Sequence, residues 1–155
     1  MTFLKSTLIA ACVFLAFAAA PSFAETARDL AQEEQNRQLV LKFYNTAFNE
    51  HKPAEAAELL SDDYKQHNPR VATGKQPFLD YFISFFKENT QSRARIVRSA
   101  AQDDLVWLHL HSTKTPDDPG RAIVDIFRVR DGKIVEHWDV IQNVPETAAN
   151  DNGMF

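Results

Sequence analysis

The segment Ala122–Gln142 places acidic and imidazole side chains within an otherwise apolar, alternating pattern. Asp125, His137 and Asp139 stand among Ile, Phe and Val residues, where a buried polar group costs free energy unless it is hydrogen-bonded. A carboxyl group in apolar surroundings and a neighbouring imidazole could take a proton from carbon beside a carbonyl and return it elsewhere. The structural alternative is a hydrogen-bonded pair that only fixes the register of two strands.

The turn near Gly132 decides whether these side chains meet. A two-residue loop would pair Arg130 with Lys133, and Asp125 and His137 would then face opposite sides of the sheet. A three-residue loop, with the glycine in the left-handed conformation as a bulge, brings the aspartate directly opposite the histidine. We expect the three-residue loop, because it keeps the two cations apart and gathers apolar residues on one face. It predicts the pairs Val129–Lys133, Phe127–Val135, Asp125–His137 and Ile123–Asp139.

Two further groups of polar residues could carry chemistry. His67 and Asn68 end an extended segment before a proline, where they could orient a substrate carbonyl or cap a following helix. His109 and His111 alternate along a strand and could share one metal ion. Because no HExxH motif and no third ligand lie at close spacing, we expect a solvated strand face there and no metal site.

Composition limits the class of protein. With 155 residues and 45% hydrophobic residues, the chain can form one domain with its own core. A net charge of −4 without a basic stripe argues against nucleic acid as a partner.

Residues 1–24 have the layout of a secretory signal peptide. Lys5 precedes an apolar run, Thr7–Ala20, and small residues at the cleavage spacing end at Ala24. We therefore expect a periplasmic or secreted domain of residues 25–155, with no membrane attachment after cleavage. Cleavage removes Cys12, the single cysteine, and with it any disulfide or thiol chemistry. A lipoprotein cut at Cys12 is the weaker alternative, because it would leave a long apolar tail.

The order of elements predicts an α+β fold. After a polar leader to Glu33, a helix buries the stripe of Val40, Phe43, Tyr44, Ala47 and Phe48. A short helix over Ala54–Leu60, an extended piece over Tyr64–Asn68 and a third helix from Thr73–Pro77 follow, the last burying Phe78, Leu79, Phe82, Ile83 and Phe86. The period then becomes two, which predicts an antiparallel meander of Arg93–Ala101, Leu105–Ser112, Arg121–Arg130 and Lys133–Gln142.

Several runs resemble the SnoaL-like polyketide cyclase family, in particular bacterial members described as predicted aldol-condensation enzymes. They are YKQHNP (Tyr64–Pro69), Gly74-Lys75, VDIFRVRDGKIVEHWD (Val124–Asp139) and the tail NGMF (Asn152–Phe155). The resemblance covers about Glu33–Phe155. It implies an NTF2-like cone, in which a curved antiparallel sheet packs against about three N-terminal helices and encloses an apolar pocket. It also implies catalysis without metal or cofactor, by an aspartate base and a polar or imidazole partner.

These observations predict an exported, cofactor-free acid–base enzyme acting on a small carbonyl compound by aldol condensation, cyclisation or isomerisation. Asp125 or Asp139 would be the base, while His137 and His67 would orient the substrate or stabilise an enolate. Asn68 would bind substrate, and the expected pocket walls are Phe43, Phe82, Trp107 and Phe127. A non-catalytic module that binds a small apolar ligand is the alternative. By resemblance we expect a homodimer, formed through Ile126, Ile134 and Trp138 on the opposite sheet face.

Overall fold

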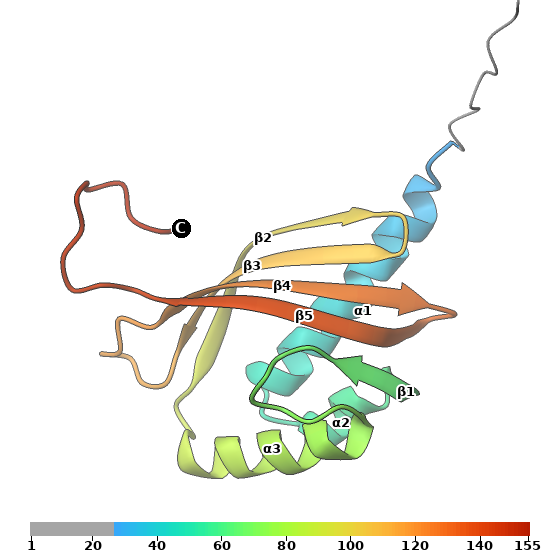
Figure 1. Cartoon of the computed structure of the whole chain (residues 1–155), viewed down its shortest axis with the longest axis horizontal. Coiled ribbons are helices and arrows are strands. Elements are labelled where there is room, and N and C mark those ends of the chain that lie inside the picture. Colours follow the sequence, from blue (N-terminus) through green and yellow to red (C-terminus); the bar gives the residue numbers. More distant parts are fainter. Residues whose placement is uncertain (1–26) are drawn as a thin grey trace, which may run out of the picture.

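Three helices pack against a single sheet in the described part of the chain, residues 27–155 of a computed structural model, and one strand of that sheet comes before the last helix (Figure 1). The elements are α1 (Leu30–Phe48), α2 (Pro53–Ala57), β1 (Leu60–Gln66), α3 (Lys75–Glu88), β2 (Arg93–Gln102), β3 (Leu105–Thr113), β4 (Arg121–Arg130) and β5 (Lys133–Asn143). This order confirms the predicted α+β class. The expected signal peptide and Cys12 lie outside the described residues. Among those residues, no helix is both long and apolar enough to cross a bilayer.

The five strands form one sheet in the order β1-β5-β4-β3-β2. Strands β2 to β5 are the predicted antiparallel meander, and their bounds agree with the period-two pattern within one residue. The extended piece predicted over Tyr64–Asn68 is present as β1, but its bounds were wrong, because α2 ends at Ala57 and the strand already begins at Leu60. That strand pairs in parallel with β5, where the backbone N–H of Ile134 donates to the carbonyl of Leu59 at 2.8 Å. Main-chain pairing with β5 thus overrides the weak strand propensity of this segment.

The β4–β5 hairpin corrects the expected turn. Arg130 pairs with Lys133 across a two-residue loop, and both loop residues have positive φ, as a type I′ turn requires. A bulge then leaves Val135 without a partner on β4 and shifts the pairing by one residue. Asp125 therefore lies opposite Asp139 instead of His137, with Phe127 opposite His137 and Ile123 opposite Ile141. Relative to the predicted turn, the two-residue loop moves the β5 side chains to the opposite face of the sheet, and the bulge returns those after Val135 to the predicted face. Asp125 and His137 therefore share one face, as predicted.

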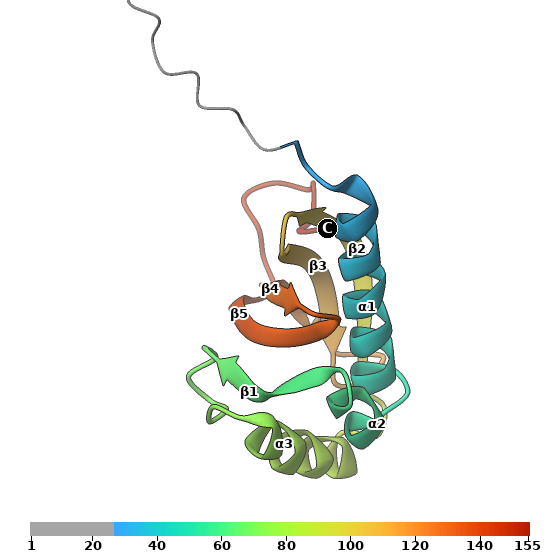
Figure 2. The ribbon, with the colours of Figure 1, turned by 90° about the vertical axis from the view of Figure 1, so that its right-hand side faces the viewer.

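The core lies between α1 and the inner face of the sheet. Figure 2 shows α1 running along β2 and β3, with α3 beyond β1 at the other end. The predicted stripe of α1 is buried except for half-buried Phe48, and it meets Val106, Leu108 and Leu110 of β3. Phe43 packs against Phe127 and Phe78, each at 5.7 Å between ring centroids. Two expectations fail here: Ile83 of α3 is exposed, and Ile134, placed on the outer face by the sequence, is fully buried.

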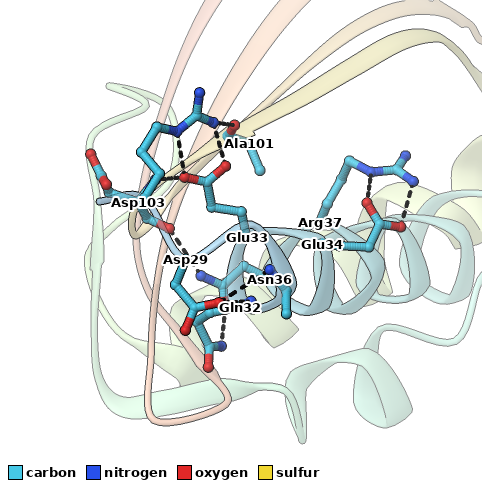
Figure 3. A network of polar contacts seen from close by, with 10 residues as sticks. Asp29, Gln32, Glu33, Glu34, Asn36, Arg37, Ala101 and Asp103 are labelled. Atoms are coloured by element: carbon cyan, nitrogen blue, oxygen red, sulfur yellow. Dashed lines mark hydrogen bonds and ion pairs between the residues drawn. The ribbon is translucent and has the colours of Figure 1, made fainter. Parts of the chain in front are cut away.

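A polar network fixes the start of α1, where the sequence predicted a frayed leader (Figure 3). Asp29 caps the helix by accepting from two backbone N–H groups of its first turn. The buried carboxylate of Glu33 accepts from Arg28 and from the backbone N–H of Asp103 in the β2–β3 turn. The ion pair with Arg28, followed by the Asp103 bond, lowers the pKa of Glu33. Asn36 donates to the carbonyl of Asp103, so the helix start is tied to the sheet.

Candidate active site

A pocket of about 110 Å³ lies between α1, α3 and the inner face of the sheet. Most of its wall is aromatic, contributed by Phe43, Phe48, Phe78, Phe82, Phe85 and Phe127. One side is polar, because Gln66, Asn68, Asp125, His137 and Asp139 also line it. The β4–β5 hairpin, the last residue of β1 and the segment after it supply these five residues, and the helices supply most of the apolar wall.

Asp125, His137 and Asp139 converge as the sequence predicted. Asp125 and Asp139 are direct cross-strand partners, and one ligand atom from each of the three residues lies within 4.8 Å of the other two. His137 Nε2 is 3.3 Å from Asp125 Oδ1, and these two residues are only 8% and 4% exposed. Two like charges placed opposite each other at such depth repel strongly unless a proton or a cation lies among them.

Gln66 determines which nitrogen of His137 carries a proton. Its Oε1 lies 2.7 Å from His137 Nδ1 and also accepts from the backbone N–H of Asn68 at 3.0 Å. A backbone N–H can only donate, so the Gln66 atom at this point is the oxygen, and Nδ1 must donate to it. Nε2 then faces Asp125 Oδ1, where two lone pairs would repel, so one proton lies between these two atoms. The sequence analysis missed Gln66; the alternation Tyr64, Gln66, Asn68 toward one face was the available signal.

Asn68 holds the Asp139 carboxylate in place. Its Oδ1 accepts from the backbone N–H of Arg70 at 2.8 Å, so its Nδ2 is the group that donates to Asp139 Oδ2. Among the described residues, the other oxygen of this carboxylate has no hydrogen-bond donor. Asp139 is half-buried and lines the pocket, so a substrate can reach that oxygen.

Two buried tyrosines surround the carboxylates and were not predicted as site residues. Burial, followed by the negative charge of Asp125, raises the pKa of both Tyr44 and Tyr64 well above the ordinary value. Both phenols therefore stay protonated at neutral pH. Tyr64 accepts from Gln66 Nε2 at 3.1 Å and so holds the side chain that orients His137.

Two predicted site residues lie elsewhere. His67 faces the outer side of the sheet, where its Nε2 contacts Glu136 at 2.9 Å and its ring stacks on Trp138 at 4.9 Å. Trp107 is also on the outer face, opposite Ile126. Both predictions of a pocket position were wrong, because side chains alternate along extended backbone and the neighbours Asn68 and Leu108 take the inner side. Phe43, Phe82, Phe127 and Asn68 do line the pocket.

The same cluster has the geometry to ligate a metal ion. Within residues 27–155, Asp125, His137 and Asp139 are the one set of three side chains close enough to hold an ion. His109 and His111 have other contacts: the His109 ring stacks on Phe155, the His111 ring packs tilted against it, and His111 Nε2 lies 2.9 Å from the carbonyl oxygen of Pro119. Gln66 leaves only Nε2 of His137 for a ligand, at the position where the shared proton lies.

Comparison with known proteins agrees with this architecture. Residues 40–137 match the SnoaL-like domain. The chain belongs to the SnoaL-like domain family. No curated protein matches this SnoaL-like chain.

Three solved structures share the fold of the SnoaL-like chain at low sequence identity. A protein from Kribbella flavida DSM 17836, provisionally named a ketosteroid isomerase, has a TM-score of 0.61 and 21% identity over 77% of this chain and 86% of its own. AclR from Streptomyces galilaeus, provisionally named a hydroxylase, has a TM-score of 0.61 and 20% identity over 71% of this chain and 90% of its own. An NTF2-like protein of unknown function from Mesorhizobium loti has a TM-score of 0.61 and 21% identity over 72% of this chain and 94% of its own. These similarities confirm the NTF2-like fold.

Proposed function

We propose that this SnoaL-like protein is a cofactor-free acid–base enzyme that moves a proton to and from carbon beside a carbonyl. The reaction would be an aldol condensation, a cyclisation or an isomerisation of a small carbonyl compound. One observation carries the proposal: two carboxylates and an imidazole meet at the polar side of an otherwise aromatic pocket. An apolar enclosure strengthens the electrostatic interactions on which such proton transfers depend.

Asp139 is the proposed base. Asp125 is engaged with His137, with which it shares a proton, whereas one oxygen of Asp139 has no hydrogen-bond donor within the described residues and can accept a proton from the substrate. Asn68 holds one oxygen of Asp139 and leaves the other for the substrate. Of the two aspartates, Asp139 is the proposed base because it is the less buried one.

The His137–Asp125 pair is the proposed acid. When Asp139 removes the proton from carbon, the C–H electrons move toward the carbonyl and charge develops on its oxygen. The proton held between Nε2 and Oδ1 can be donated to that oxygen or can stabilise it as a hydrogen bond. Return of the Asp139 proton to a different carbon completes an isomerisation. In an aldol step the enolate carbon instead attacks a second carbonyl, and the resulting alkoxide oxygen takes the proton held by Asp139, which restores the base.

Deuterium exchange tests this assignment. In D2O the wild type should exchange the α-protons of a bound enolisable ketone, followed by proton NMR, and Asp139→Asn should slow the exchange about 10²- to 10⁴-fold. Asp62→Asn is the matched control, because that side chain is fully exposed and does not line the pocket. If Asp125→Asn and Asp139→Asn both keep the wild-type exchange rate, the acid–base assignment is wrong.

A carrier protein is the second candidate, because the aromatic wall would suit an apolar ligand that is held and not converted. It predicts that a stoichiometric small molecule remains bound through purification, visible by native mass spectrometry. It also predicts no exchange at any enolisable ketone in the panel.

Export and assembly complete the proposal. We propose that residues 1–24 direct the chain to the periplasm or the outside of the cell and are removed there. We also propose a homodimer through the outer sheet face, where Trp107, Ile126 and Trp138 lie in one row across β3, β4 and β5. Val124 and Val140 extend the apolar row and are 40% and 71% exposed.

A further inference from the structure

We propose that the mouth of the pocket binds a carboxylate of the substrate through Arg121 and Arg70. The substrate would then be an apolar keto acid, with its hydrocarbon body in the aromatic pocket and its anionic end at the rim. The keto part rests on the proposed function, while the carboxylate site can be tested separately.

The two arginines lie where two cavities meet. Besides the aromatic pocket, the structure has a wider polar groove formed by the β3–β4 loop, the end of β5 and the segment after β1. Arg70 and Arg121 line both cavities, together with Asn68, Asp139 and Ile141. Arg121 opens β4 on the inner face, the same face as Asp125, and Ser112 opposite it adds a hydroxyl.

Neither guanidinium has an ion-pair or hydrogen-bond partner for its side chain within residues 27–155. The guanidinium groups of Arg28, Arg37 and Arg128, in contrast, all pair with carboxylates. A guanidinium offers several donors in a planar fork that fits a carboxylate, so Arg70 and Arg121 present unused binding capacity at the rim.

The acidic groups around the rim are mostly engaged already. Asp118 accepts from the backbone N–H groups of Lys114 and Gly120 at 2.8 and 2.9 Å. Asp139 is held by Asn68, which leaves exposed Glu146 as the one rim carboxylate without a hydrogen-bond partner in the described chain. Lys114 adds a third cation to the groove.

The charge of Arg121 is felt inside the aromatic pocket. Burial and the charge of Asp125 raise the pKa of Tyr44, and the positive charge of Arg121 opposes that rise. A guanidinium that acts on a fully buried phenol also attracts an anionic ligand entering the same cavity.

Strand geometry sets the spacing within the ligand. Arg121 and Asp125 are four residues apart on β4, which places their Cα atoms about 13 Å apart. Asp139 lies opposite Asp125. The carboxylate and the reacting carbon should therefore bind at separate positions along the pocket, and the probe chosen carries its ketone and its carboxylate several bonds apart.

Isothermal titration calorimetry with a matched pair of ligands tests the site. The probes are the aryl ketone 5-benzoylpentanoate and its primary amide, which differ only at the charged end. The wild type should bind the carboxylate at least about tenfold more tightly than the amide, as expected for charge-assisted hydrogen bonds. Arg121→Gln should remove most of that preference, and Arg70→Gln should reduce it.

The control is Arg130→Gln, at the exposed far end of the same strand, which changes net charge equally. Circular dichroism melts verify that each variant is folded, and if Arg121→Gln does not fold, Arg121→Lys and Arg70→Gln carry the test. Equal affinity of the wild type for the two probes overturns the proposal. Equal losses in the Arg121 and Arg130 variants, or no binding of the carboxylate, also overturn it.

Deuterium uptake by the same probe separates this inference from the proposed function. Asp139→Asn should slow deuterium uptake at the α-carbon about 10²- to 10⁴-fold and keep the carboxylate preference. A preference without uptake in the wild type leaves the site standing and removes the enzyme. Deuterium uptake without a carboxylate preference would remove the carboxylate site and leave the proposed enzyme.

Discussion

Replacing Gln66 by leucine would remove the acceptor that holds the proton on His137 Nδ1. The change leaves Nδ1 and the backbone N–H of Asn68 without their shared partner, at a position where the His137 side chain is only 10% exposed. A buried donor without an acceptor costs about 1–3 kcal/mol, so the free energy of unfolding should fall by about that amount. Urea denaturation measures this change in the free energy of unfolding. The control is Gln142→Leu, at an exposed position of β5.

The same substitution should alter the chemistry. Without Gln66 the imidazole can turn or exchange tautomers, so that Nε2 no longer shares a proton with Asp125. We expect the rate of α-proton exchange to fall by more than the loss of stability explains, with the protein still folded under the assay conditions. Gln66→Glu should keep the acceptor and add negative charge, which favours the doubly protonated ring, and should move the acid limb of the pH–rate profile upward.

Nitrogen NMR of the His137 ring examines the reasoning directly, because the shifts of Nδ1 and Nε2 differ between a protonated and an unprotonated nitrogen. In the wild type Nδ1 should carry a proton, and in Gln66→Leu the fraction of rings with a protonated Nδ1 should fall. A wild-type spectrum with an unprotonated Nδ1 would refute the argument from Gln66, whatever the mutants do.

Three further outcomes are expected. Because the pKa of Glu33 is lowered by Arg28 and the Asp103 N–H, its stabilisation is present above the unfolded value of 4.5 and is lost as pH falls through the lower folded value. Glu33→Gln should therefore be less stable at pH 7 and lose less on acidification, in urea melts compared across pH. Phe43→Ala removes a 1%-exposed ring from the core and should cost about 3–5 kcal/mol by denaturant melts, more than the half-buried Phe82→Ala. Val140→Glu should shift a dimer to monomer in sedimentation experiments while α-proton exchange continues, and a wild type that is monomeric at micromolar concentration would contradict the proposed interface.

Periodicity was sufficient to predict that the helices and the meander exist, because one buried face per element leaves a regular pattern in the sequence, but it did not fix the start of α1 or the end of α2. The stripe on α1 and the bounds of β2 to β5 follow from it directly. The shared face of Asp125 and His137 was also predicted, although from a turn that the structure does not have: the bulge at Val135 restores the face that the two-residue loop exchanges.

What the sequence could not supply depends on contacts between distant segments. The parallel pairing of β1 with β5 is a main-chain interaction, and the side chains of β1 give little indication of it. The roles of Gln66 and Tyr64 arise from that pairing, because it brings Gln66 opposite His137. The misplacement of His67 has the same origin: the inner and outer sides of this segment are fixed only once its strand is known.

Val135 has a consequence for how relatives of this chain should be compared. Since it has no partner on β4, a shorter relative that lacks it can keep Asp125 opposite Asp139 and Phe127 opposite His137. A residue lost at the two-residue turn would instead send the imidazole to the solvent side. Two alignments that differ only in where they open a single gap thus describe one protein with the proton-transfer residues assembled and another without them.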